Sequence, residues 1–448
     1  MSAVADTLKD KSAMTPDVKR IVTTAEQVYL DGFAARKEAL PGTAATATRR
    51  RAAIASFEGA GLPHRRIEEW KYTDLRALMR DAYPPATGAV ASAVPADPLS
   101  DGGFDTITVV NGALVGEIPT LDGVTVLPLA DALASTDADV QAALAITPAR
   151  GGNAVLDLNT AFMDHGFVMI VAPGATVETP LMIRSIINAA DSATYTNRNA
   201  VIVGEGAKLT LVQTFEGDGA AFHRNGTIQI NVGDKAEFNH IRLETETDEA
   251  VHLSNMIIEI GTEAAYRKYG LSTGASVMRN DLSIRFNGEN STADIASIFL
   301  KAGEQHHDTT MYVDHAVPNC TSRELFKSVL GGKSRGVFQG KIMVRPHAQK
   351  TDGEMSANAI LLTEDAEMDA KPELEIYADD VVCGHGATAG QLDDDLLFFL
   401  RARGLPEREA KALLILAFIG EALEAVENEA VHAHMLALTE DWIGKADI

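Results

Sequence analysis

The sequence predicts a mainly β protein, a parallel β-solenoid over residues 160–391 flanked by α-helical regions. Between about residues 160 and 390 the apolar runs are short, β-branched and closely spaced, as in VMIVA, AVIVG, TIQINV, MIIEI and LEIYA. Glycine-containing turns separate these runs at a spacing of 27 to 32 residues, represented by Gly174, Gly206, Gly233, Gly261 and Gly288. That period is typical of stacked solenoid coils.

A β-sandwich with regular hairpin turns is the alternative fold. Its turn signals are expected every 8 to 12 residues, a shorter interval than the one observed. The repeat also carries no helical pattern, which favours the solenoid. We expect each glycine to supply the positive φ that a sharp corner between coils needs.

Four further regions are expected around the solenoid. Residues 1–83 form an N-terminal helical region, with two helices broken at Pro41-Gly42, and residues 84–103 form a linker rich in Pro, Ala, Ser and Gly. Residues 104–159 form a mixed α/β lead-in that ends with a helix at about 130–144. Residues 392–448 return to a helical pattern and form a C-terminal helical domain.

Composition excludes several classes of function. The formal net charge of -24 disfavours nucleic acid as a partner. The first thirty residues lack an apolar signal-peptide core, and no apolar stretch is long enough to cross a membrane, so we expect a cytoplasmic protein. The two cysteines, Cys320 and Cys383, are too few for a disulfide framework and are expected to be thiols.

Cys383-Gly384-His385 is the sharpest candidate site. Residues two apart in a strand point to the same face, so the thiol and the imidazole could meet one metal or one partner surface. Both groups suit iron or zinc. The alternative is a buried free cysteine beside a hydrogen-bonded structural histidine, which is the commoner arrangement.

Two other polar groupings have weaker functional interpretations. An acidic run between residues 364 and 395 could attract cations, although such faces are usually only solvated. His306, His307 and His315, with Cys320 nearby, could be metal ligands or hydrogen-bonded structural residues. Gly332-Lys333-Ser334 lacks the glycine required five positions earlier, so it is not a phosphate-binding loop. None of these groups supplies an activated nucleophile.

The C-terminal region contains an apolar stripe with helical spacing between residues 407 and 426, formed by Ala410, Leu413, Leu414, Ala417, Phe418 and Leu423. The stripe could pack on its own domain or dock a partner protein. Phe398 and Leu400 precede it in the run LLFFL. We expect Phe398, Leu400, Leu413 and Phe418 to contact a partner.

Two long stretches and one short element resemble a known family. The stretches are SRELFKSVLGGKSRGVFQGKIMV (322–344) and AQKTDGEMSANAILLTEDAEMDAKPELEIYADDVVCGHGATAGQLDDDLLFFLRARGLPEREAKALL (348–414). The short element is GLPHRRIEEWKYTDLR (61–76). They resemble the SufB/SufD family, and more closely its SufD branch, whose members belong to the SufB-SufC-SufD scaffold for iron-sulfur cluster assembly.

This resemblance implies a right-handed parallel β-helix and a scaffold role without catalysis. It also implies pairing with SufB through the β-helix, docking of the ATPase SufC on the C-terminal helices, and a transient iron-sulfur cluster shared with SufB. His385 matches the family histidine at the SufB interface, and Cys383 is its companion there. SufB has a scaffold cysteine at the position of Ala357 and a glutamate at that of Gly386, so both positions favour the SufD branch.

Several alternatives stay open at this point. The chain could be a purely structural solenoid subunit without a metal role, or a carbohydrate-active β-helix enzyme, although 6% aromatic residues is low for a sugar-binding groove. The sequence leaves undecided whether this subunit ligates the cluster, whether a flavin accompanies the complex, and whether the isolated chain forms a homodimer.

Overall fold

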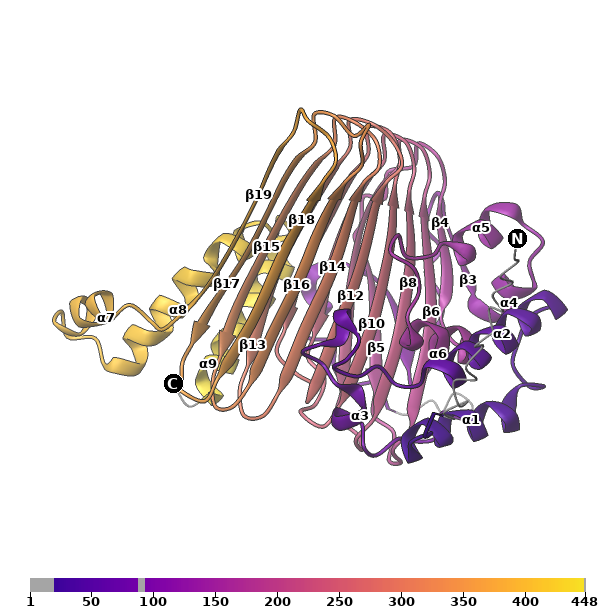
Figure 1. Ribbon diagram of the computed structural model, residues 1–448, viewed down its shortest axis with the longest axis horizontal. Helices are drawn as coiled ribbons and strands as arrows, with labels where there is room; N and C mark the ends of the chain where they lie inside the picture. Colours follow the sequence, from indigo (N-terminus) through magenta and orange to yellow (C-terminus); the bar gives the residue numbers. More distant parts are fainter. Residues whose placement is uncertain (1–19, 88–92, 447–448) are drawn as a thin grey trace, which may run out of the picture.

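The computed structural model describes residues 20–87 and 93–446, which form a β-solenoid of about eight turns with helices packed on its outer faces (Figure 1). Residues 1–19 of the expected N-terminal region, residues 88–92 of the expected linker and residues 447–448 lie outside the described part. The predicted fold class, mainly β with a solenoid core and helices at both ends, is confirmed.

Successive strands of the solenoid alternate between two sheets. The ten-stranded sheet contains β1 (Asp105–Val110), β2 (Ala113–Val115), β5 (Leu181–Ile187), β7 (Lys208–Gly217), β9 (Glu237–Glu244), β11 (Ala265–Ser272), β13 (Thr292–Lys301), β15 (Thr321–Leu330), β17 (Asp352–Leu361) and β19 (Val382–Gly390). The nine-stranded sheet contains β3 (Val124–Pro128), β4 (Phe167–Val171), β6 (Thr194–Val203), β8 (His223–Val232), β10 (Val251–Ile260), β12 (Val277–Phe286), β14 (His306–His315), β16 (Arg335–Val344) and β18 (Glu367–Ile376).

Neighbouring strands within the solenoid are parallel and in register from coil to coil. Val251 of β10, for example, lies between His223 of β8 and Val277 of β12. Antiparallel pairing is found where the sheets begin, between β1 and β2 and between β3 and β4. The β-sandwich alternative is therefore wrong, because parallel strands in one sheet need a crossover through the other sheet.

The glycine turns act in two different ways. Gly174 and Gly206 have positive φ, as predicted. Gly233, Gly261 and Gly288 do not, and the left-handed residues there are Lys235, Glu263 and Asn290, two positions later. A Cβ on Gly233 would lie 2.8 Å from the carbonyl oxygen of Val203, so glycine is needed at these corners because the neighbouring coil approaches closely.

The interior of the solenoid has an apolar half and a polar half. On β10 the inward positions are His252 and Ser254, followed by the apolar Met256, Ile258 and Ile260. On β9, in the facing sheet, the charged inward residues come last. The strand begins with the inward residues Phe238 and His240 and ends with Arg242 and Glu244. Buried charges therefore gather along one side of the solenoid interior.

The helices are α1 (Thr24–Arg36), α2 (Ala44–Ala60), α3 (Leu75–Leu78), α4 (Leu129–Ala134), α5 (Ala138–Ala145), α6 (Ala154–Phe162), α7 (Asp394–Arg401), α8 (Glu407–Glu424) and α9 (Glu429–Lys445). Most of them pack on the coils, whereas α7 extends away from the solenoid and has no buried residue (Figure 1). The prediction of a single helix at 130–144 is wrong, because α4 and α5 are separate helices there. Asp137 accepts hydrogen bonds from the backbone of Asp139 and Val140, and this cap starts a second helix there.

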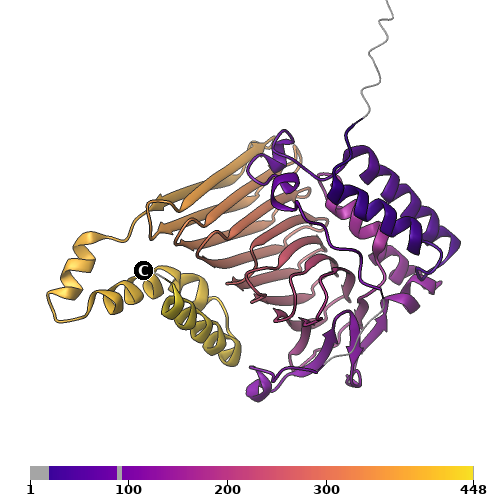
Figure 2. The ribbon, with the colours of Figure 1, turned by 90° about the horizontal axis from the view of Figure 1, so that it is seen from below.

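The N-terminal and C-terminal helices lie on opposite sides of the solenoid (Figure 2). Tyr29, Phe57 and Phe162 of the N-terminal set pack with Val251 and Val277 on the outer face of the nine-stranded sheet. On the ten-stranded sheet, α8 and α9 pack over an outer face that includes Ile241, Leu243, Ile298 and Val329. Because both sheets are covered, their strands are apolar on both faces, which explains their near-continuous apolar runs.

The EEWKYT element, residues 68–73, attaches the N-terminal region to the nine-stranded sheet. The guanidinium of Arg279 on β12 lies 3.7 Å from the ring centroid of Trp70 and forms an ion pair with Asp308 on β14. The Thr73 hydroxyl donates to Asp308 and lies 2.9 Å from His306 Nε2. All of these polar groups are buried, so the element is held by hydrogen bonds as well as by packing.

Replacing Thr73 by Val should lower the free energy of unfolding by about 1–3 kcal/mol, because it removes a buried hydroxyl that bonds to two buried partners. Urea denaturation would measure the change. Thr125→Val on β3, where the side chain is exposed, should change stability by less than about 0.5 kcal/mol. Equal effects of the two substitutions would show that the buried network contributes little.

Candidate functional site at the last coil

The last coil of the solenoid, β18 and β19, has no further coil stacked on it. Each strand pairs on one side only, β18 with β16 and β19 with β17. Apolar side chains are exposed around this end, with Val382 73% and Tyr377 61% accessible. A strand edge with unpaired backbone groups is a template for pairing with another chain.

Cys383 and His385 share the inward-facing side of β19, as their spacing predicts. Cys383 lies beside Gly353 and His385 beside Met355, and Met355 belongs to the solenoid core. Cys383 is half-buried against that core, whereas His385 is exposed because no coil follows. The two side chains therefore occupy inward-facing positions of β19 that stay open to solvent at the end of the solenoid.

The surroundings keep Cys383 protonated. Burial raises the pKa of its thiol, and the carboxylates of Asp352 and Glu324 raise it further. A Cβ at Gly353 would lie 3.6 Å from the sulfur, so the glycine leaves this side of the thiol uncrowded. A metal ion would have to displace the proton before the thiolate could bind it.

Glu324 is a candidate that sequence reasoning missed. It lies in the same inward row of residues as His385, with Met355 between them. Its side chain is buried, neither carboxylate oxygen has a hydrogen-bond partner among the described residues, and burial raises its pKa to about 8. The alternation in SRELFKSVL places it on the same face as Phe326, and this is the signal that could have revealed it.

Four residues of the acidic run lie on the outer face of β18 and form ion pairs there: Glu367, Asp369, Glu373 and Glu375. Asp369 lies 2.5 Å from Arg335, and Glu375 lies 2.8 Å from Lys341, with both cations on β16. Glu367 lies near the same Arg335, and Glu373 lies near the same Lys341. These contacts reduce the attraction for an incoming cation, in agreement with the interpretation of a solvated face.

The three histidines of β14 do not converge. His306 faces outward to Thr73, whereas His307 and His315 face the interior and bond to Thr309 and Ser322. Burial lowers the pKa of His306 and of His315 to about 4. In the described part of the chain, no three His, Cys, Asp or Glu side chains are grouped closely enough to hold a metal ion.

The four predicted contact residues on the C-terminal helices fall into two sets by their exposure. Phe398 is 74% and Leu413 47% exposed, whereas Leu400 and Phe418 are half-buried. The ring of Phe418 lies 4.9 Å from Lys327 Nζ on the chain's own solenoid. Leu396 and Phe399 extend the exposed set, which we call the α7 apolar patch: Leu396, Phe398, Phe399 and Leu413.

No helix within residues 20–87 and 93–446 is both long and apolar enough to cross a membrane.

Two family models match most of the chain. Residues 185–418 match the SufBD core domain of the SUF system for FeS cluster assembly, and residues 23–183 match the SufBD protein N-terminal region. The first match spans nearly all of the solenoid, together with α7 and most of α8.

Curated relatives agree with these matches. The iron-sulfur cluster assembly protein SufD of Escherichia coli is 33% identical over 84% of this chain and 88% of its own length. Iron-sulfur cluster assembly SufBD family proteins of Synechocystis sp. and Mycobacterium leprae are 27% and 28% identical over 94% and 90% of this chain, covering 95% and 96% of their own lengths. The chain therefore belongs to the SufBD family of iron-sulfur cluster assembly proteins and is a homologue of SufD.

Proposed function

We propose that the chain is a non-catalytic scaffold subunit that pairs with SufB through its last coil, docks the ATPase SufC through its C-terminal helices, and takes part in iron entry or nascent cluster assembly at His385 and Cys383. The observation that carries the proposal is the uncapped last coil. It combines an unpaired strand edge with two inward-facing groups that suit iron.

Pairing with a second solenoid at this edge would continue both sheets. The backbone groups of β18 and β19 would gain partners, and the exposed Val382 and Tyr377 would be buried. Cys383 and His385 would then lie at the junction between the two chains. The same edge could pair with another copy of this chain, so the isolated chain could form a homodimer when the partner is absent.

The iron ion or nascent cluster would be the substrate of the assembly and not a resident cofactor of this chain. Cys383 and His385 provide at most two ligands, and the described residues contain no group of three. Because iron-sulfur clusters are commonly held by four protein ligands, the partner subunit would supply the others. This requirement explains why the site lies at an interface and not inside one chain.

The α7 apolar patch supports docking of a partner on the C-terminal helices. Its four large apolar side chains are between 47% and 74% exposed. In contrast, α8 and α9 cover the outer face of the ten-stranded sheet, so removing the whole helical region would expose Ile298 and Val329. Point substitutions in the patch are therefore a cleaner test than truncation.

A purely structural subunit without a metal role is the second candidate. It is favoured by the paired acidic face and by the protonated Cys383, neither of which is arranged to attract iron. The two candidates differ in what His385 does.

His385→Ala should reduce cluster yield at least about tenfold while leaving the complex with SufB and SufC assembled, because one interface side chain rarely carries a whole association. Iron and labile sulfide in the purified complex would be counted. His347→Ala, at an exposed position in a turn, is the matched control and should assemble clusters normally. A wild-type yield with His385→Ala would assign the chain a structural role only.

Val382→Lys should weaken pairing with SufB about tenfold or more, because a charge on an edge strand opposes strand pairing and the side chain lies at the exposed edge. Affinity would be measured by titration calorimetry, and self-association by sedimentation. Binding of SufC should not change. If SufB still bound with the original affinity, the pairing surface would lie elsewhere.

Phe398→Asp should have the reciprocal effect, with SufC affinity reduced about tenfold or more and SufB pairing intact, because it places a charge at the most exposed residue of the α7 apolar patch. Leu114→Asp, an exposed apolar position on β2, is the control. Loss of SufC binding in both variants would indicate a non-specific effect of charge, and no loss in either would exclude this patch.

A further inference from the structure

The outer face of β19 is almost bare of side chains. Its outward positions are Val382, Gly384, Gly386, Thr388 and Gly390, because the alternate positions face inward with the candidate site. Three of these five positions are glycine, and we call them the glycine row: Gly384, Gly386 and Gly390. β19 is an edge strand of the ten-stranded sheet (Figure 1), so the glycine row lies where a partner strand would pair.

Nothing within the described part of the chain requires glycine in this row. None of the three residues has a positive φ, so other residues can adopt the same backbone conformation. A Cβ built on any of them would meet no atom within 4 Å, apart from its neighbours in sequence. Because glycine weakens the interior of a strand, the row costs stability without a structural reason in this chain.

The glycines of the other strands differ from the glycine row. A Cβ on each of them would lie within 3.4 Å of another atom of the chain: Gly217, Gly226, Gly270, Gly336, Gly340 and Gly353. On β16, for example, a Cβ on Gly336 would lie 2.9 Å from Met368 Sδ. These glycines make room for a neighbouring group of their own chain. By the same principle, the glycine row makes room for a group that comes from outside the chain.

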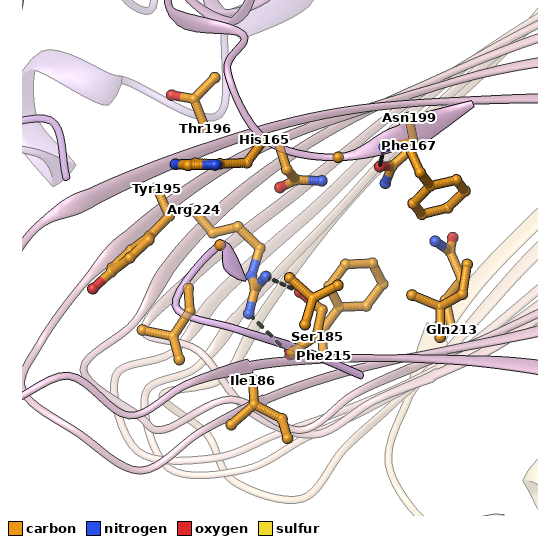
Figure 3. A pocket seen from close by; sticks show the side chains of 16 residues that line it. His165, Phe167, Ser185, Ile186, Tyr195, Thr196, Asn199, Gln213, Phe215 and Arg224 are labelled. Atoms are coloured by element: carbon orange, nitrogen blue, oxygen red, sulfur yellow. Dashed lines mark hydrogen bonds between the residues drawn. The ribbon is translucent and has the colours of Figure 1, made fainter. Parts of the chain in front are cut away.

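Inner coils fill such space with their own side chains. Around the cavity between β5, β6, β7 and β8, Phe167, Phe215 and Arg224 reach inward from different strands (Figure 3). Arg224 donates to the Ser185 hydroxyl at 2.6 Å, and only about 40 Å³ stays open. The glycine row, in contrast, lies where no coil follows.

The wall beside the glycine row is polar. Glu354 and Ser356 of β17 lie next to the row in register. Asn358 donates to the Ser356 hydroxyl at 2.9 Å and accepts from the Thr388 hydroxyl at 2.7 Å. A wholly apolar group laid over the row would remove these polar groups from water, which is unfavourable. The wall therefore favours a side chain with a polar end.

Glu354 gives this wall a negative charge. Its side chain is 70% exposed, and Arg323 lies 3.8 Å from it. The same guanidinium lies 2.6 Å from Asp352, so Arg323 pairs mainly with that carboxylate and Glu354 can accept a further cation. Long basic side chains combine an apolar stem with a charged end, so they fit a bare floor beside a carboxylate.

We propose that the glycine row receives a long basic side chain, arginine or lysine, from the SufB strand that pairs with β19. Its stem lies over Gly384 and Gly386, and its charge pairs with Glu354. Residues opposite each other in paired strands have Cβ atoms about 4.5–5.5 Å apart, which is close enough for this contact. The inference rests on the pairing proposed above and adds the contact that makes the pairing specific.

Gly386→Val tests the glycine row, because the new side chain fills the space above the strand. The variant should be as stable as the wild type in urea denaturation, since its Cβ meets nothing in its own chain. Its affinity for purified SufB, measured by titration calorimetry, should fall at least about tenfold. Wild-type affinity would overturn the proposal. If this variant does not fold, Gly386→Ala decides in the same way, with an expected loss of about threefold.

Thr388→Val is the matched control, because it lies on the same face of β19 and changes the shape of the side chain very little. Its affinity for SufB should change by less than about twofold. An equal loss in Thr388→Val and Gly386→Val would overturn the proposal, since any change on this face would then weaken pairing.

Glu354→Gln tests the charge at constant size. Affinity for SufB should fall about threefold at low salt, and it should depend less on salt concentration than in the wild type. Glu304→Gln, at an exposed position in the turn before β14, should change neither quantity. Wild-type affinity and salt dependence in Glu354→Gln would exclude a basic side chain and overturn the proposal.

Comparison with Val382→Lys separates this inference from the pairing surface itself. Loss of SufB binding in Val382→Lys but not in Gly386→Val would overturn the glycine row alone and leave pairing at the last coil in place. No loss in either variant would overturn both.

Discussion

The parallel backbone ladder between successive coils is the constraint on which the rest of this structure depends. Every inner coil satisfies its amide and carbonyl groups on two sides, so each coil templates the next in register. The same rule requires close approach at the corners, which is why Gly233, Gly261 and Gly288 cannot carry a side chain without a clash. It also leaves an unpaired edge at the last coil, β18 and β19.

The sequence predicted the parts of the fold that repeat or that have strong local signals. Glycine spacing indicated the coils, and the Pro41-Gly42 break separated α1 from α2. It could not show which face of each strand is inward, because helices cover the outer faces and make both sides apolar. The break at Asp137 was missed because a single capping side chain decides it.

The candidate site was likewise only partly predictable from the sequence. A period of two was enough to place Cys383 and His385 on one face. Their exposure depends on the absence of a following coil, and the pairing of the acidic run depends on Arg335 and Lys341 in the neighbouring coil. Those contacts join residues more than thirty positions apart, so they become visible only when the register is known. The local alternation in SRELFKSVL places Glu324 on an inward face, but its burial without a hydrogen-bond partner becomes visible only in the stacked coils.

The distribution of polar groups gives the two ends of the solenoid different properties. Near the start, the buried cations Arg224 and Arg242 are paired with the buried carboxylates Glu246 and Glu244. Near the last coil, Glu324 is buried without a cation, and Cys383 is held as a thiol beside it. Both sheets also end in edge strands at the start of the solenoid, β2 and β3, so strand pairing with another solenoid is available at the two ends of the axis and not through the helix-covered outer faces. The coil that carries His385 is one of these two ends.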